Sequence, residues 1–546
     1  MHAAMSNKRL SRRSVLQNLG VSATLGLLSG GLPRRARAAA EPVAETTYGK
    51  LRGASNNGVY SFKGVRYGAP TGGANRFLPP AAPTSWAGIQ DAVTFGASAP
   101  QVPATLGPFS AWYTAIQPIS EDCLFLNVFT PGLDHARRPV MVWLHGGGWV
   151  NCAGTAPGFD GTNLARGGNV VVVTINHRLN VFGQIALGTT DPRFADAANA
   201  GVLDMVAALR WVRDNIASFG GDPGNVTIFG QSGGAAKVTA LMGLPAAHGL
   251  FHKAIAESCS GGLRLTGPEE ADRQAHALAA QLGMTSVTGE ALQSVPMERL
   301  LAAMQTVADP FRPVLDGRNY QHNPFDPAAS ATVSAVPLMI GNAATEATLF
   351  LSGDPHNFSL DADAVKHRIA RFLQIDAART DRLIDAYQAT LDKPTPSDVL
   401  IAVATDYMYR RNTTRIAALQ AAQSPVYAYV FDWKTPVAGG VLRSPHTIEV
   451  PFVFGTTAAA VGLGGGGKDI PVLTRATLGR GSAFAHTGAP NVTRLPTWPR
   501  YTAESRSTMM LDLESHVVSN PGGEARMAMD GLPYYEYSMP ANFMRA

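Results

Sequence analysis

The 546-residue sequence has little cysteine and, beyond residue 40, no uncharged apolar run long enough to cross a bilayer. Its three cysteines are Cys123, Cys152 and Cys259, and none of them has metal-ligand spacing. An odd number leaves at least one thiol unpaired in a monomer, so we expect three free thiols, buried or half-buried. No internal repeat stands out. The composition is otherwise that of a globular chain with a large core, 45% hydrophobic and 16% charged.

Acidic residues are absent from the first 40 positions, and this absence explains the basic character of the whole chain. The formal charge is +5 and the pI about 9.1. Without the seven basic residues of that segment, 38 Lys and Arg face 40 Asp and Glu, a net charge of −2. The body of the protein therefore has no basic excess, and a nucleic-acid partner is not expected. The seven residues are Lys8, Arg9, Arg12, Arg13, Arg34, Arg35 and Arg37.

The same segment has the layout of an export signal. Paired arginines at 12–13 precede a weakly apolar stretch over 19–32, and residues 34–40 offer small-residue cleavage sites after Ala38 or Ala40. This layout resembles a bacterial twin-arginine signal. It implies a protein that folds before export to the periplasm or the medium, which suits the low cysteine content. We therefore expect a signal over 1–40 and one domain over 41–546; the alternative for 1–40 is a disordered basic tail.

Short apolar runs and one amphipathic segment predict an α/β fold. Runs that are apolar on both faces are typical of buried parallel strands. Between the second and third runs, apolar residues from Leu203 to Ile216 repeat every three to four positions and predict a helix. Strand, helix, strand is the order of a parallel βαβ unit. We expect region 240–440 to be mainly helical, interrupted by the strand near 336–340. The runs are 139–144, 169–175, 225–229, 336–340 and 426–431.

The centre of the functional argument is the G-x-S-x-G at 230–234, between a strand and a helix. A serine on a sharp strand-to-helix turn projects its hydroxyl into a cleft, and small neighbours let the strained turn close. Ser232 is therefore the candidate nucleophile. The motif alone is weak, because a glycine-rich chain of this length can contain one by chance; the strand–turn–helix context strengthens it.

A second glycine-rich turn follows the strand at 139–144. The sequence His-Gly-Gly-Gly-Trp at 145–149 exposes backbone N–H groups that no side chain blocks. Those of Gly147 and Gly148, with that of Gly233, are expected to form an oxyanion hole. The alternative is a flexible turn at the strand exit.

A serine nucleophile needs a base and an acid that orients the base. Among thirteen histidines, His446 lies in a loop just after the last strand, and His486 and His145 are the alternatives. Glu346 lies in the loop after the strand at 336–340, and the acid of such a site comes from a strand exit between the serine and the histidine. An isolated carboxylate in a loop is, however, more often solvated.

The chain resembles the type-B carboxylesterases, the family of cholinesterases and bacterial p-nitrobenzyl esterases. The resemblance covers roughly 42–540. It implies an α/β-hydrolase fold with an open, mostly parallel sheet, helices on both faces, a largely helical region over the active site and no cofactor. It implies the triad Ser232, Glu346 and His446, with Glu449 and Ser258 as supporting polar residues. The blocks that carry it are 62–70, 121–128, 176–179, 219–223 and 249–255.

Several positions depart from the family pattern. Gln231 stands where the family usually has a glutamate before the serine, and Gly233 stands where it often has an alanine after it. Thr447 replaces the family's small residue after the histidine. Cys123 has a disulfide partner in the family, but the partner position here is Ala99, so that bridge is absent.

These residues predict a secreted hydrolase that cleaves small-molecule carboxylic esters through an acyl-enzyme. The alternatives are an amide, carbamate or thioester hydrolase on the same triad, or a non-catalytic binding protein of the same fold. Trp149, Trp112 and Phe182 are candidates for the pocket lining, although aromatic residues more often belong to the core. Nothing in the sequence indicates an oligomeric state.

Overall fold

In the computed structural model, which describes residues 41–102, 109–114, 117–188 and 191–535, eleven strands form one mixed sheet. Their order is β14-β13-β12-β11-β10-β9-β7-β8-β6-β4-β3. The strands from β13 to β8 pair in parallel, whereas β14 at one edge and β6, β4 and β3 at the other pair antiparallel. The expected open, mostly parallel sheet is confirmed. The strands are β3 Ala54–Asn56, β4 Val59–Arg66, β6 Phe125–Thr130, β7 Arg138–Leu144, β8 Val171–Ile175, β9 Gly221–Gln231, β10 Lys253–Glu257, β11 Leu338–Ala343, β12 Val426–Phe431, β13 Ser507–Leu511 and β14 His516–Ser519.

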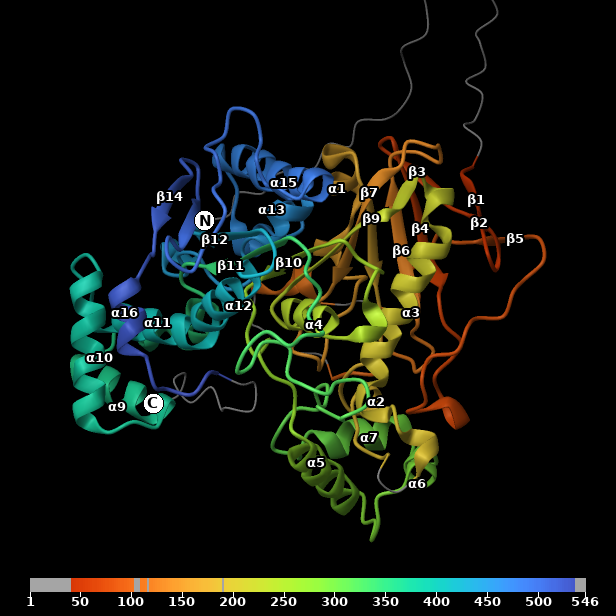
Figure 1. Cartoon of the computed structure of the whole chain (residues 1–546), viewed down its shortest axis with the longest axis horizontal. Helices are drawn as coiled ribbons and strands as arrows, with labels where there is room; N and C mark the ends of the chain where they lie inside the picture. Colours follow the sequence, from red (N-terminus) through yellow and green to blue (C-terminus); the bar gives the residue numbers. More distant parts are fainter. Residues whose placement is uncertain (1–40, 103–108, 115–116, 189–190, 536–546) are drawn as a thin grey trace, which may run out of the picture. The chain divides into compact units, whose positions relative to one another are not determined.

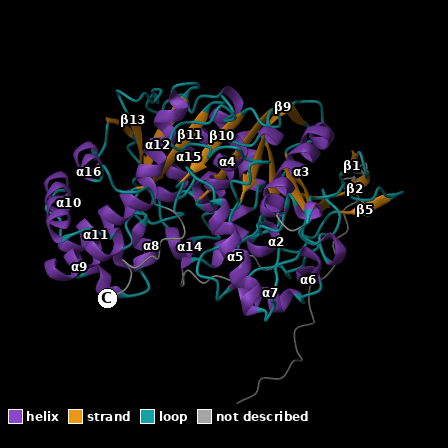
Figure 2. Ribbon diagram, turned by 60° about the horizontal axis from the view of Figure 1, so that its bottom comes forward, coloured by secondary structure: helices purple, strands orange, loops and turns teal. Residues whose placement is uncertain are grey.

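Helices cover both faces of the sheet (Figures 1 and 2). Side chains alternate along β7: Val140 and Val142 join the core beneath α3, α4 and α12, whereas Met141 and Trp143 join the core beneath α1, α13 and α15. Strands buried in this way on both faces carry the apolar runs seen in the sequence. The helices are α1 Thr162–Gly168, α3 Ala200–Asn215, α4 Gly233–Met242, α12 Arg411–Ala421, α13 Val450–Phe454 and α15 Asp469–Thr487.

Two helical groups with their own apolar cores lie beyond the sheet (Figure 1). One contains α5 to α7 and the other α8 to α11, so region 240–440 is richer in helices than in strands, although loops make up much of it. The strands expected at 336–340 and 426–431 are present as β11 and β12, and a further strand, β10, was not predicted. Its sequence Lys-Ala-Ile-Ala-Glu has too short an apolar centre to be recognised by pattern. The helices are α5 Pro268–Gln281, α6 Gly289–Gln293, α7 Met297–Met304, α8 Ala347–Leu351, α9 Ala362–Leu373, α10 Ala377–Thr390 and α11 Pro396–Thr405.

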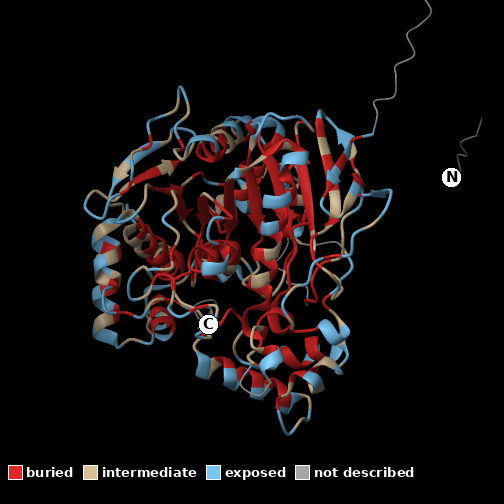
Figure 3. Cartoon of the chain, turned by 45° about the vertical axis from the view of Figure 1, so that its right-hand side comes forward, coloured by how far each residue is buried: buried red, intermediate tan, exposed pale blue. Residues whose placement is uncertain are grey.

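Smaller elements complete the described chain, and the described residues form one compact unit. The buried strands form its interior, and the outer helices expose one side to solvent (Figure 3). Within the described ranges, none of the helices combines the length and the apolar character that a membrane crossing requires. The export-signal interpretation concerns positions 1–40, which lie outside the described residues. The remaining elements are β1 Val43–Thr46, β2 Gly49–Arg52, β5 Ile89–Asp91, α2 Asn180–Gly183, α14 Val461–Gly464 and α16 Gly523–Ala528.

A buried ion pair fixes α3 to the loop that follows β8. The guanidinium of Arg178 donates to both carboxylate oxygens of Asp204 at 2.8 and 2.7 Å, and the backbone N–H of Arg178 adds a third bond at 3.0 Å. The two side chains are 2% and 0% exposed. Removing one partner of such a pair leaves the other charge buried without compensation.

We therefore expect Asp204→Ala to lower the free energy of unfolding by about 3–5 kcal/mol. Asp214→Ala on the same helix is the matched control, because its pair with Arg213 is exposed and is worth less than about 1 kcal/mol. Urea unfolding of both variants measures the difference. Equal losses in the two variants would contradict this account.

Candidate active site

Ser232 sits on the tight turn between β9 and α4. Its φ of 60° and ψ of −124° lie in a region that residues other than glycine rarely adopt. Its N–H donates to the carbonyl of Glu257 at 2.8 Å, which ties the turn to the neighbouring strand. A Cβ at Gly230 would lie 2.6 Å from the carbonyl oxygen of Leu144, and one at Gly234 only 2.0 Å from it. Both glycines of the motif are thus required by close packing against the end of β7.

The glycine-rich turn after β7 lies directly against this elbow. Gly147 and Gly148 have φ values of 81° and 62°, and a Cβ at Gly147 would lie 2.2 Å from the carbonyl oxygen of Asn151. A Cβ at Gly233 would lie 2.4 Å from the nitrogen of Gly148. The structure therefore brings together the three glycines selected as oxyanion-hole candidates, and the absence of side chains allows their close approach.

Glu346 and His446 follow β11 and β12, whose carboxyl ends lie at the same edge of the sheet as that of β9. Nδ1 of His446 is hydrogen-bonded to Oε2 of Glu346, and the two side chains are 3% and 0% exposed. The rings of Phe350 and Tyr409 lie 5.3 and 4.8 Å from the imidazole, centroid to centroid. This arrangement fixes the ring orientation and leaves Nε2 free of the carboxylate.

The carboxylate of Glu346 is held in turn by buried groups. Its Oε1 accepts from the N–H of Ala343 at 2.7 Å and from the hydroxyl of Ser258 at 2.6 Å. The same hydroxyl lies 3.1 Å from Oε1 of Glu449. Burial, together with the nearby charge of Glu346, raises the pKa of Glu449 to about 8. Burial, together with the nearby Glu449, also raises the pKa of Glu257. At neutral pH Glu449 is therefore largely protonated, which concentrates the negative charge on Glu346.

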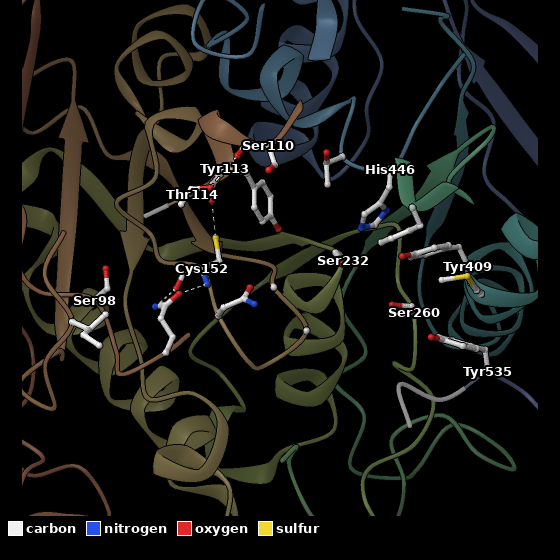
Figure 4. A pocket seen from close by; sticks show the side chains of 18 of the residues that line it. Ser98, Ser110, Tyr113, Thr114, Cys152, Ser232, Ser260, Tyr409, His446 and Tyr535 are labelled. Atoms are coloured by element: carbon white, nitrogen blue, oxygen red, sulfur yellow. Dashed lines mark hydrogen bonds between the residues drawn. The ribbon is translucent and has the colours of Figure 1, made fainter. Parts of the chain in front are cut away.

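A cavity of about 330 Å³ opens above the elbow and contains Ser232, His446, Gly147 and Gly148 in its wall (Figure 4). Its described lining contains no Asp, Glu, Lys or Arg. The aromatic lining is Tyr113, Phe350, Tyr409 and Tyr535.

Trp149, Trp112 and Phe182, the aromatic candidates for this lining, instead pack into three separate apolar cores. Pattern analysis could not separate them from the true lining, because aromatic side chains serve both uses.

The competing histidines lie away from the cavity wall. His145 is buried with its Nδ1 3.1 Å from the carbonyl oxygen of Gly146, and its ring stacks on that of His177 with centroids 4.9 Å apart. His486 belongs to α15 and has its Nε2 3.0 Å from the carbonyl oxygen of Gly168. Of the three histidines considered, His446 alone lines the cavity.

The cysteines are free and buried, as expected. Cys152 lines the cavity and its thiol donates to the carbonyl of Tyr113 at 3.4 Å. In the described ranges, no three His, Cys, Asp or Glu side chains gather as metal ligands would. Sequence reasoning missed Lys237, a fully buried lysine on α4. The signal for it was a single charge within an otherwise small and apolar run.

Comparison with known proteins agrees with this geometry. The model of the carboxylesterase family matches residues 40–529. The para-nitrobenzyl esterase of Bacillus subtilis is 36% identical over 89% of this chain and 98% of its own length. The phenmedipham hydrolase of Pseudarthrobacter oxydans is 34% identical over 88% of this chain and 96% of its own length. A carboxylesterase structure from Geobacillus stearothermophilus superposes with a TM-score of 0.78 at 37% identity, covering 89% of this chain and 99% of that one. The chain therefore belongs to the carboxylesterase family, and it is a carboxylic ester hydrolase of the α/β-hydrolase fold.

Proposed function

We propose that the chain cleaves uncharged carboxylic esters through an acyl-enzyme on Ser232, with His446 as base and Glu346 as the acid that orients it. The observation that carries the proposal is the shared cavity. Ser232 occupies a strained turn in its wall, and His446, held by Glu346, lies in the same wall.

In the acylation step, Nε2 of His446 takes the proton of the Ser232 hydroxyl while its oxygen attacks the ester carbonyl carbon. The carbonyl π electrons move to oxygen, and the resulting oxyanion accepts hydrogen bonds from the N–H groups of Gly147, Gly148 and Gly233. When the intermediate collapses, the bond to the alcohol oxygen breaks and His446 returns the proton to it. Glu346 stabilises the imidazolium that exists between the two transfers.

Deacylation repeats the sequence with water in place of serine. His446 removes a proton from the water, the oxygen attacks the acyl carbon, and the same three N–H groups stabilise the second oxyanion. Collapse releases the carboxylic acid and restores the Ser232 hydroxyl. The network behind Glu346 supports a single negative charge, because Glu449 is largely neutral at pH 7.

The lining of the cavity favours neutral substrates of moderate size. Without Asp, Glu, Lys or Arg among the described lining residues, a charged substrate would lose its hydration without gaining an ion pair. The lining includes the apolar side chains of Phe350 and Met408 and the uncharged polar side chains of Gln101 and Asn151. A cavity of about 330 Å³ suits aryl and short alkyl esters. The name of the Bacillus subtilis relative, para-nitrobenzyl esterase, supports an aryl ester as the first substrate to test.

We also propose that the enzyme is exported from a bacterial cell, as the paired Arg12 and Arg13 and the small residues before Glu41 indicate. The signal would be removed after Ala38 or Ala40, so the mature enzyme would begin at Ala39 or Glu41.

For the catalytic proposal, we expect Ser232→Ala to lower kcat on p-nitrophenyl acetate and butyrate by at least about 10⁴-fold, because it removes the hydroxyl that forms the acyl-enzyme. Ser294→Ala, an exposed serine at the end of α6, is the matched control and should retain full activity. Activity that survives in Ser232→Ala would overturn the assignment. A matched butyramide that is cleaved faster than the ester would favour an amidase instead.

For export, we expect Arg12→Lys combined with Arg13→Lys to keep the full chain in the cytoplasm of a bacterial host with a twin-arginine system. Esterase activity is measured in the cytoplasmic, periplasmic and medium fractions. The double variant Arg34→Lys and Arg35→Lys keeps the same charge and should still be exported. Equal export of both variants would refute a twin-arginine signal.

A further inference from the structure

Lys237 is a fully buried lysine placed between the nucleophile elbow and the glycine-rich turn. It lies on α4, five residues after Ser232, and has 0% exposure. A buried ammonium group is costly unless it is hydrogen-bonded. Its Nζ donates to the carbonyl oxygens of His145 and Gly146 at 2.7 and 3.3 Å. It also lies 5.3 Å from the centre of the Trp149 ring, within range of a cation–π interaction.

The groups that surround this amine add no compensating charge. Among the described titratable side chains, those that act on Lys237 or feel its charge are His145, His177 and Cys152. Burial and the nearby Lys237 lower the pKa of His145 and of His177 well below the usual value. Burial raises the pKa of the Cys152 thiol to about 12. All three are neutral near pH 7. Burial lowers the pKa of Lys237 itself to about 7.

The two accepting carbonyls belong to the peptide units that precede Gly146 and Gly147. In a trans peptide the N–H points opposite to the C=O. With both carbonyls directed at Lys237, the N–H groups of Gly146 and Gly147 point away from it. A bond from a cation to the Gly146 carbonyl also polarises that peptide and makes the N–H of Gly147 a stronger donor.

We infer that Lys237 is a positioning residue for the oxyanion hole: it orients the peptide units of the glycine-rich turn and strengthens the Gly147 donor. This inference rests on the proposed function, in which the Gly147 N–H stabilises the oxyanion. Lys237 itself does not touch the substrate, because the described cavity wall does not include it.

The close approach of α4 makes this contact possible. A Cβ at Gly234 would lie 2.0 Å from the carbonyl oxygen of Leu144, so only a glycine lets the helix start this close to the strand exit. One turn further along, Lys237 then reaches back beneath the loop. The same helix therefore carries the nucleophile at its start and the cation that holds the opposing donors.

The test replaces Lys237 with methionine, which preserves the volume but removes the charge and the donors. We expect kcat on p-nitrophenyl butyrate to fall about 10- to 100-fold with KM changed less than about twofold. Affinity for a trifluoromethyl ketone, whose adduct on serine carries an oxyanion, should fall by a similar factor. Lys253→Met is the matched control: that amine, 8% exposed, bonds Asn225, neither residue belongs to the described cavity wall, and kcat should be unchanged.

A second variant separates the donor from the charge and covers a failure of Lys237→Met to fold. Lys237→Gln keeps an N–H donor without charge and should lose about tenfold in kcat. The wild type should lose kcat as pH rises through about 7, where the lysine gives up its proton, and Lys237→Gln should lack that decline. Circular dichroism and thermal unfolding establish that each variant is folded.

The outcomes distinguish this inference from the catalytic proposal. Wild-type kcat and ketone affinity in both Lys237 variants, or an equal loss in Lys253→Met, overturns the positioning role. If esterase activity disappears in Ser232→Ala while kcat and ketone affinity in the Lys237 variants equal those of the wild type, this inference alone fails. If activity survives in Ser232→Ala as well, the proposed function also fails.

Discussion

The strained backbone of Ser232 is the constraint on which the rest of the site depends. A φ of 60° at a serine persists only where several surrounding contacts hold the backbone in place. Here these contacts come from the end of β7, the carbonyl of Glu257 and the first turn of α4. The glycines at 230 and 234 are the consequence, since any side chain there would displace the strand exit. The parallel sheet then supplies the other groups, because the carboxyl ends of β7, β9, β11 and β12 lie along one edge.

Burial determines the electrostatics on both sides of Ser232. Behind His446, three buried carboxyl groups lie near one another, and burial raises the pKa of Glu449 and of Glu257 while Glu346 bonds the imidazole. Beneath the glycine-rich turn, one cation, Lys237, is held by backbone carbonyls. The Glu346 carboxylate beside the proposed base and the Lys237 amine beneath the proposed oxyanion donors are thus both excluded from solvent.

Sequence reasoning reached the local features and missed those that depend on tertiary packing. Strand β12, helix α3 and the turn at Ser232 were predictable because their residues are contiguous and periodic. The Glu346–His446 pair spans 100 residues, so spacing left His486 and His145 open until the family resemblance was considered. Strand β10 and the aromatic lining at Tyr409 were not predictable, because a short mixed sequence or a lone aromatic residue acquires its role only through its neighbours.

The central claim is that Ser232 becomes acylated during turnover. Its most direct test is to treat the purified enzyme with diethyl p-nitrophenyl phosphate, an ester mimic whose adduct on serine is not readily hydrolysed, and to map the modified peptide by mass spectrometry. The account predicts one adduct per chain, on Ser232, with p-nitrophenol released in equal amount and activity lost in proportion. An inactivated enzyme labelled at another residue, or a fully active enzyme labelled on Ser232, would contradict it.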